Sequence, residues 1–255
     1  NWNISGERIA KSTNLQTLEL INDFSVLIYG LKNFANNQYL TIQNNHDKKT
    51  LLENGLVAII GAGTGLGISR GLFTTSNEIH VLPSEGGHRE FAPRSKAEWD
   101  IANWLKNDLQ TERLSLERIV SGKGLGHIAR WRLMKPDGIS HPLRKLAEDS
   151  IPGSSLESQI PYLASNAAKN GDQLMNEALE LWLSAYGSAA GDLVLQELCH
   201  SGLWIAGGTA SKHLEGIKSA TFLKAFRNKG RFKSLLEKTP VTILIDPEAG
   251  LFSAG

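Results

Sequence analysis

The sequence predicts an α/β or α+β fold with an excess of helix in its second half. Short apolar runs that fit buried strands occupy Leu18–Ile21, Leu56–Ile60, Leu203–Ala206 and Val241–Ile245. Segments with apolar residues at helical spacing separate these runs. Strands that alternate with helices favour a sheet on which helices pack.

The first run places a carboxylate at a strand end. Leu18–Ile21 stops at Asn22 and Asp23, and open α/β sheets keep their chemistry at the carboxyl ends of strands. Val26–Phe34 follows with apolar residues at helical spacing, and a polar connection covers 43–54. Asp23 is therefore a candidate site residue, although on its own it would fit a simple Asx-turn residue equally well.

A hairpin follows the strand Leu56–Ile60. Two apolar runs, Ile68–Phe73 and Ile79–Leu82, flank a polar turn at 74–77, which is the pattern of paired antiparallel strands. The glycine-rich segment 61–67 therefore leads into a strand and not into a helix.

The second half of the chain is mainly helical. Ser95 can cap a helix with Glu98 at the capping-box position, and this helix runs to about Leu109 with Trp99 among its expected buried residues. A short extended or helical piece, Leu116–Val120, comes next, and 121–124 breaks it. Further helical segments are expected at 125–133, 143–147, 156–169, 172–199, 211–219, 222–228 and 232–236.

The composition narrows the classes of function. A chain of 255 residues can bury a full core in one large or two small domains. Its net charge of +1 gives no electrostatic case for binding nucleic acid or an anionic membrane. No apolar run approaches the roughly 20 residues that span a bilayer. We expect no signal peptide, and the single cysteine, Cys199, fits a reducing cytoplasm.

The first glycine-rich turn favours contact with phosphate. Glycines let backbone N–H groups approach phosphate oxygens, and Thr64 adds a hydroxyl donor. A dinucleotide fingerprint fails, because its sixth position falls on Leu66 or Ile68 and a hairpin follows, and the Walker lysine is absent. A tight hairpin that needs positive φ is the alternative. Four alternating glycines exceed what a turn requires: Gly61, Gly63, Gly65 and Gly67.

The second glycine-rich turn has the polar groups that suit a sugar. Glu85 and His88 flank two glycines, so an acid and an imidazole can face one space. A carboxylate accepts hydrogen bonds from two vicinal hydroxyls, and a neutral imidazole donates or accepts. The alternative is an exposed loop with an incidental histidine. A metal site is disfavoured, since no second His or Cys lies at ligand spacing.

Seven motifs in order resemble the bacterial-type glucokinase family. The resemblance covers nearly the whole chain and implies the ribonuclease H-like, actin-like ATPase (hexokinase) fold, with two α/β domains closing over a cleft. It also implies the reaction ATP + D-glucose → ADP + glucose 6-phosphate. The motifs are Leu20–Phe24, Ile59–Gly67, Leu82–His88, Glu90–Pro93, Leu116–Gly122, Ile205–Gly208 and Asn228–Phe232.

The resemblance also implies the roles of individual residues. Asp23 corresponds to the catalytic base, and the glucose ligands correspond to Asn22, Asp23, Glu85, His88 and Glu117. The second phosphate loop corresponds to Gly63, Thr64 and Gly65, and the turn facing the adenosine to Gly207 and Gly208. ATP and Mg²⁺ are the implied cofactors, with the charge of the phosphates left to Mg²⁺ and no metal ligand assigned to the chain. Glucose and ATP are the implied partners, and a homodimer stays open.

The domain division also follows from the resemblance. Residues 1–33 are expected to belong to a small domain, 34–240 to a large domain with a helical excess, and 241–255 to a strand and turn leading back. The family opens with a strand and a D-x-G-G-T phosphate loop that has no match here. We expect this loop in a segment upstream of Asn1, which leaves the small domain incomplete; a truncated relative is the alternative.

Two other functions remain as alternatives at this stage. A non-catalytic sugar-binding or sensing protein could use the same fold and would bind glucose without turning over ATP. An NAD(P)-dependent enzyme is disfavoured by the register of the glycines and by the hairpin that follows them.

Overall fold

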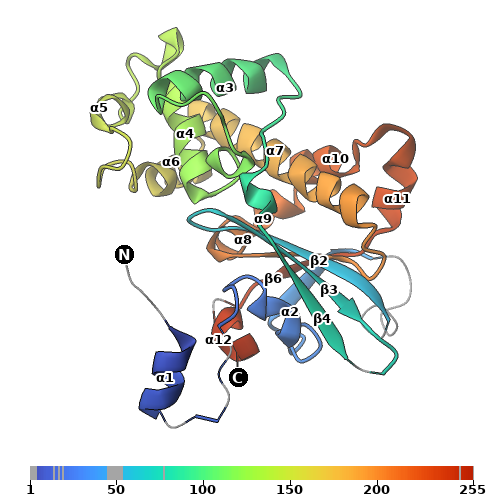
Figure 1. The fold of residues 1–255 in the computed structure, drawn as a ribbon. Coiled ribbons are helices and arrows are strands. Elements are labelled where there is room, and N and C mark those ends of the chain that lie inside the picture. Colours follow the sequence, from blue (N-terminus) through green and yellow to red (C-terminus); the bar gives the residue numbers. More distant parts are fainter. Residues whose placement is uncertain are drawn as a thin grey trace.

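The computed structural model describes residues 5–13, 15–16, 18, 20–44, 54–76, 78–246 and 248–254. Within them a mixed six-stranded sheet forms the centre of the molecule, in the order β1-β6-β5-β2-β3-β4. Helices cover both faces of this sheet (Figure 1). The strands are β1 (Tyr39–Gln43), β2 (Gly55–Ala62), β3 (Leu66–Phe73), β4 (Ile79–Ser84), β5 (Leu203–Ala206) and β6 (Val241–Leu244).

The sheet combines a parallel centre with antiparallel flanks. β2, β5 and β6 run parallel, so their carboxyl ends meet at one edge of the sheet. β1 pairs antiparallel with β6 on one side, and β3 and β4 continue antiparallel from β2 on the other. The predicted hairpin of β3 and β4 is confirmed. The parallel edge is where an open α/β sheet binds its ligands.

The larger core lies between one face of the sheet and the helical half of the chain. Ala58, Ile60 and Ile68 point into this core, where Trp182 and Tyr186 of the long helix α7 (Gln173–Glu197) are fully buried. The backbone N–H of Ala62 donates to the Tyr186 hydroxyl over 3.2 Å, which ties α7 to the end of β2. The helices of this half are α3 (Lys96–Asp108), α4 (Gly122–Leu133), α5 (Arg144–Asp149), α6 (Ile160–Lys169), α7 (Gln173–Glu197), α8 (Gly208–Lys212), α9 (Leu214–Lys218), α10 (Ala220–Arg227) and α11 (Lys233–Lys238).

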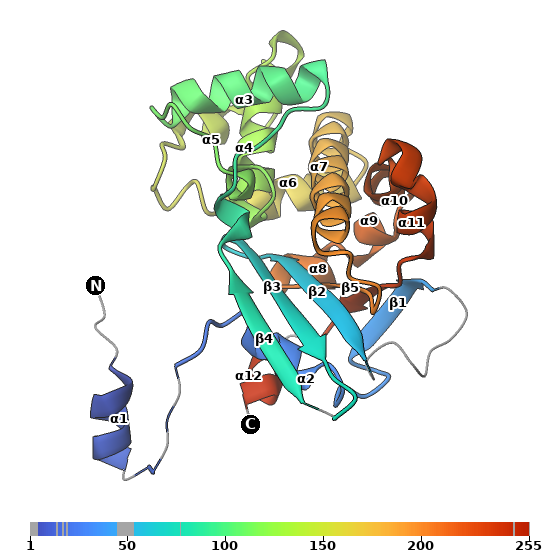
Figure 2. The same cartoon turned by 45° about the vertical axis from the view of Figure 1, so that its right-hand side comes forward.

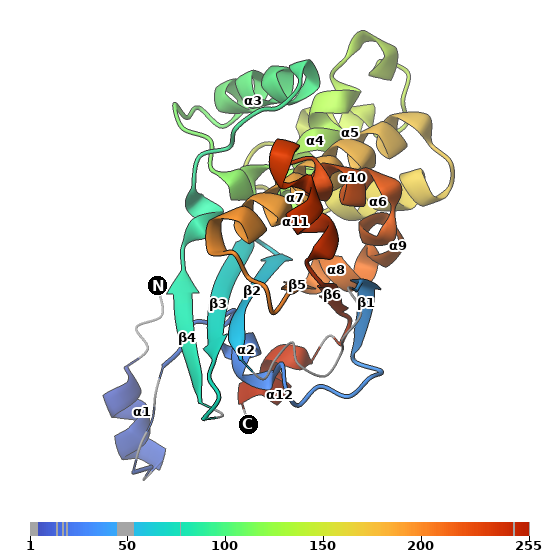
Figure 3. The same ribbon diagram turned by 90° about the vertical axis from the view of Figure 1, so that its right-hand side faces the viewer.

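A smaller core covers the opposite face. Helix α2 (Val26–Gly30) and helix α12 (Ala249–Ala254) lie side by side there, as Figure 3 shows from the edge of the sheet. Val57 and Ile59 point to this side, because successive residues of a strand face opposite ways. Helix α1 (Gly6–Thr13) lies apart from the body at the end of an extended segment (Figure 2) and has no buried residue.

Several expectations from the sequence need correction. The described residues of the first predicted strand, Leu18, Leu20 and Ile21, form no strand. A strand is held by hydrogen bonds to a neighbour, and none of the described strands pairs with this segment. Trp99 is 60% exposed, because α3 buries the face that carries Ile101 and Leu105 instead.

Other elements were not predicted or begin elsewhere. The sequence did not predict helices α1 and α12 or strand β1. Most of the connection expected at 43–54 lies outside the described residues. The break expected after Leu116–Val120 lies at Ser121, and α4 begins at Gly122, earlier than the expected 125, because the Ser121 hydroxyl accepts from the backbone N–H of Gly124 over 3.0 Å. The division into 1–33, 34–240 and 241–255 stays a prediction. Within the described ranges, no helix has both the length and the apolar character needed to cross a bilayer.

Candidate active site

Two cavities open at the edge of the sheet where β2, β5 and β6 end. The larger, of about 860 Å³, lies between this edge and the helical half. Its lining includes Gly63 and Thr64 of the β2–β3 turn, Gly122 and Lys123 at the start of α4, and Gly208 at the start of α8. The volume lies within the roughly 300–1,000 Å³ that small-molecule sites occupy.

Two glycines of the larger cavity, Gly63 and Gly208, are not explained by protein packing. A Cβ atom added to Gly63 or Gly208 would meet no other atom of the described protein within 4 Å, and neither residue has a positive φ. A side chain there would instead project toward the space that a ligand fills. The bare backbone of these two positions leaves room for close approach by a phosphate, while the Gly63 N–H itself donates to the Gly65 carbonyl over 2.8 Å.

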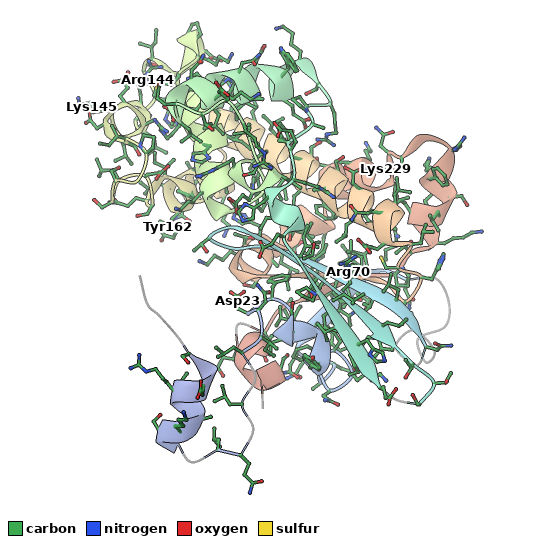
Figure 4. The ribbon with its side chains drawn as sticks, in the orientation of Figure 1. Asp23, Arg70, Arg144, Lys145, Tyr162 and Lys229 are labelled. Carbon is green, nitrogen blue, oxygen red and sulfur yellow. The ribbon has the colours of Figure 1, made fainter. Side chains whose placement is uncertain are left out.

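The smaller cavity, of about 310 Å³, contains the predicted base. Asp23 lines it together with Gly207, Asp246 and Gly208. Among the described residues, the two linings share Gly208 and Lys212. The two cavities therefore meet at the start of α8. Figure 4 shows Asp23 on the same side of the molecule as Tyr162, which lines the larger cavity.

Asn22 determines the conformation of the loop around Asp23. Its side-chain oxygen accepts from the backbone N–H groups of Phe24 over 2.9 Å and Ser25 over 3.0 Å. The Asx turn that the sequence offered as an alternative for Asp23 is thus made by Asn22. This leaves the exposed Asp23 carboxylate without a local hydrogen bond among the described residues and directed at the smaller cavity.

Two of the four alternating glycines seat the ring of Phe24. Gly61 and Gly67 pair opposite each other in the β2–β3 ladder. A Cβ atom at Gly61 would lie 2.3 Å from the Phe24 ring, and one at Gly67 would lie 2.5 Å from it. The ring rests on the bare backbone of both strands. Because Phe24 follows Asp23 directly, this contact fixes the loop that carries the predicted base.

Three of the five predicted glucose ligands, Glu85, His88 and Glu117, come together on the other side of the turn, whereas no contact joins them to Asn22 or Asp23 among the described residues. His88 Nδ1 lies 3.4 Å from Glu117 Oε1, and His88 Nε2 lies 3.7 Å from Glu85 Oε2. The exposed fractions are 82% for the Glu85 side chain, 57% for His88 and 21% for Glu117, so a ligand can reach them. A Cβ atom at Gly65 would lie 2.9 Å from Glu117 Oε2. Gly65 therefore faces this acidic cluster and lines neither cavity.

Backbone contacts join the acidic cluster to the phosphate turn. The Ser121 hydroxyl donates to the carbonyl of Glu117 over 2.6 Å, and the N–H of Gly122 donates to the carbonyl of Gly63 over 2.8 Å. Buried Trp182 donates its Nε1–H to the Ser121 carbonyl over 3.0 Å. The start of α4 thus holds Glu117 and Gly63 in one rigid unit, which fixes the acidic cluster relative to the β2–β3 turn.

The far wall of the larger cavity is held by two histidines. Buried His127 contacts Glu157 over 3.2 Å and, together with the Gly153 backbone, it lowers the pKa of Glu157 to about 2. Burial, together with the nearby cations Lys169 and Lys212, lowers the pKa of His213 to about 4. His213 is therefore neutral at pH 7, and Glu157 is ionised.

The structure also identifies residues that the motifs did not. Lys212 and Lys123 supply cations to the larger cavity, although the sequence left the phosphate charge to Mg²⁺. Lys212 follows Gly208 by one helical turn, and that spacing was the available signal. Gly207 has φ of 90° and its Cβ would lie 2.7 Å from the Ala62 carbonyl, so it is required by the backbone. Across the described ranges, no group of three His, Cys, Asp or Glu residues could hold a metal ion.

Comparisons with known proteins agree with this architecture. The crystal structure of a glucokinase from an Antarctic psychrotroph superposes with a TM-score of 0.76 at 26% identity, over 99% of this chain and 72% of that chain. A ROK family glucokinase from Streptomyces griseus, solved in complex with glucose and AMPPNP, has a TM-score of 0.58 at 19% identity, over 98% of this chain and 70% of that one. The fold is that of the actin-like ATPase sugar kinases.

Sequence relatives narrow the assignment further. A model of the glucokinase family matches residues 1–255. The glucokinase of Synechocystis sp. is 35% identical over 259 residues, which cover 100% of this chain and 72% of that protein. The glucokinase of Pectobacterium atrosepticum is 32% identical over 254 residues, covering 100% and 72%. The chain belongs to the glucokinase family.

Proposed function

We propose that this protein transfers the γ-phosphoryl group of ATP to the 6-hydroxyl of D-glucose. The O6–Pγ bond forms as the bond from Pγ to the β,γ-bridging oxygen breaks, and ADP leaves. Asp23 accepts the O6 proton as general base. Such transfer requires mainly positioning and charge stabilisation from the protein, and a positioned base contributes roughly 10²–10⁴-fold.

The observation that carries this proposal is the meeting of the two cavities at Gly208. The nucleotide occupies the larger cavity, with its phosphates at Gly63 and Thr64, while Asp23 lines the smaller one. The glucose hydroxyls bind Asn22, Glu85, His88 and Glu117. Gly65 belongs to the same phosphate turn, and its Cα faces the Glu117 carboxylate.

A magnesium ion accompanies the ATP. Mg²⁺ is bound mainly by phosphate oxygens, waters and one or two carboxylates, so it needs no dedicated protein cage. Asp246 is the suitable carboxylate of the smaller cavity, because Gln38 donates to it and lowers its pKa. The ion would offset the charge of the phosphates. Removal of Mg²⁺ with a chelator should abolish turnover.

The cellular setting follows from the same proposal. Glucose and ATP are the small-molecule partners, and the cytoplasm supplies both. The thiol of Cys199 is buried, which raises its pKa to about 12 and keeps it unreactive. A homodimer is the assembly to test, by sedimentation of the purified protein.

Substitution of the base tests the proposal. In the full-length protein, Asp23→Asn should lower kcat for glucose 6-phosphate formation by about 10²–10⁴-fold while glucose still binds. Asp100→Asn is the matched control, since Asp100 pairs with Lys96 on α3, away from both cavities. Near wild-type turnover by Asp23→Asn would refute the assignment of the base. Glucose-dependent thermal stabilisation without any turnover by the wild type would favour a sugar-binding protein instead.

A further inference from the structure

Lys212 lies at the junction of the two cavities. It ends helix α8, and it is the cation that the described linings of both cavities have in common. Lys123 and Lys169 line the larger cavity and are not part of the described lining of the smaller one. Lys212 thus shares one cavity with Thr64 and the other with Asp23.

The Lys212 ammonium is available to a ligand. Lys212 is exposed, and it forms no ion pair with a carboxylate of the described residues. Lys123, by contrast, faces Glu157 across the larger cavity and helps to lower the pKa of that carboxyl.

The geometry points to Lys212 as the cation that binds the transferred phosphoryl group. This inference rests on the proposed function, because it requires ATP in the larger cavity and the base Asp23 in the smaller one. Reacting atoms must lie about 3–3.5 Å apart, so the γ-phosphoryl group must sit where the two cavities meet. Lys212 is the side chain that supplies positive charge at that point.

The role of Lys212 is electrostatic. During transfer, negative charge spreads over the three equatorial oxygens of the phosphoryl group. The O6 proton moves to Asp23, the O6–Pγ bond forms and ADP departs, while the Lys212 ammonium keeps its proton and its charge. A fixed cation aimed at developing charge stabilises the transition state more than the ground state. No Walker lysine is present in the sequence, and Lys212 supplies the equivalent charge from a different element.

Three variants of the full-length protein test this role. Lys212→Met removes the charge and keeps the length of the side chain, while Lys212→Arg keeps the charge. Lys218→Met is the matched control, because Lys218 on α9 pairs with Glu215 over 2.8 Å and lines neither cavity. Lys212 is exposed, so Lys212→Met should fold, and its melting temperature should equal that of the wild type within about 2 °C.

Kinetics and binding provide separate readouts. Lys212→Met should lower kcat by about 10–100-fold and change KM for glucose little. The expected loss of kcat is smaller than for a fully enclosed donor, because Lys212 is exposed. The substitution should also weaken the binding of a non-hydrolysable ATP analogue more than the binding of ADP. Lys212→Arg should recover most of the activity, and Lys218→Met should match the wild type.

The outcomes separate this inference from the proposed function. A wild type that forms glucose 6-phosphate together with a Lys212→Met variant within about twofold of its kcat would overturn the role of Lys212 alone. A wild type without turnover would contradict the proposed function. In that case the binding measurement still tests the role of Lys212. If Lys212 binds the terminal phosphate, Lys212→Met must lose the preference of the wild type for the triphosphate over the diphosphate.

Discussion

Gly61 and Gly67 carry the ring of Phe24, whereas Gly63 and Gly208 face open space in the larger cavity. The first pair is glycine because another part of the protein approaches the backbone closely. The second pair has no protein neighbour that would exclude a side chain. The glycine-rich stretch 61–67 therefore combines two glycines on which the Phe24 ring packs with one open glycine, Gly63. Gly208, after β5, adds the second open position.

Among the variants that test this contrast, the largest effect is expected from adding a side chain where the Phe24 ring packs on the glycine backbone. Gly67→Ala places a Cβ atom 2.5 Å from the Phe24 ring, so the ring and the adjacent Asp23 must move. We expect kcat to fall about 100-fold, since a small misplacement of a catalytic group has effects of this size. The free energy of unfolding should fall by about 1–3 kcal/mol. Steady-state kinetics and thermal unfolding measure the two effects.

Gly71→Ala is the control for this variant. Gly71 lies on the same strand, and its Cβ would lie 2.3 Å from Ile28, away from both cavities. It should destabilise the fold to a similar extent and leave kcat unchanged. If Gly71→Ala reduced kcat as strongly as Gly67→Ala, the loss would reflect general destabilisation and not the position of Asp23.

Removal of the ring should have a somewhat smaller effect. Phe24→Ala should lower kcat by about 10–100-fold and leave KM for ATP unchanged, because the nucleotide cavity does not include Phe24. Phe24→Tyr should restore turnover. Tyr39→Ala is the matched control, since Tyr39 is another half-buried aromatic of the smaller core and packs edge-on against Trp204. A loss of kcat in Tyr39→Ala would argue against a specific role for Phe24.

The open glycines should affect binding and not stability. Gly63→Ala adds a methyl group that meets no described protein atom, so the melting temperature should not change. We expect KM for ATP to rise about 10-fold, because the methyl group occupies the approach of a phosphate. An unchanged KM for ATP would contradict the assignment of the phosphates to this turn.

The last prediction concerns pH and His213, in the wall of the larger cavity. The pKa of His213 is lowered from 6.5 to about 4 in the folded protein, so the unfolded chain binds more protons between these values. Stability should be fully present above pH 6.5 and should decline as the pH falls toward 4, by on the order of 2–3 kcal/mol. His213→Gln should flatten this decline in thermal unfolding measured across the window. If the stability of His213→Gln declined as steeply with falling pH, the decline would have to come from other titratable groups.

The sequence predicted the sheet strands β2 to β6, the hairpin and most of the helices, because their apolar periodicity is local. It did not predict β1 or α12, since each is held by a distant partner: β1 by pairing with β6, and α12 by packing on α2. The strand expected at Leu18–Ile21 does not form in the described residues of that segment, because none of the described strands pairs with them. Apolar composition favours a strand, but pairing decides whether one forms.

The candidate site was predictable only through the motifs. Glu85, His88 and Glu117 were expected in one cluster, and the structure brings them together. The division of the glycines could not be derived from spacing, because it depends on the placement of Phe24. Lys212 was not predicted as a site residue, because its candidacy depends on lining both cavities and not on a sequence motif.

Thermal unfolding of the wild type, Gly63→Ala and Gly67→Ala, with and without ATP, tests the central contrast most directly. A ligand that binds the folded state raises the melting temperature by an amount that grows with the logarithm of its concentration divided by Kd. Gly63→Ala should melt with the wild type in the absence of ATP and lose most of the ATP-induced shift. Gly67→Ala should melt about 2–8 °C lower and keep that shift. The reverse pattern, with Gly67→Ala losing the shift and Gly63→Ala losing stability, would contradict the assignment of the two glycine pairs.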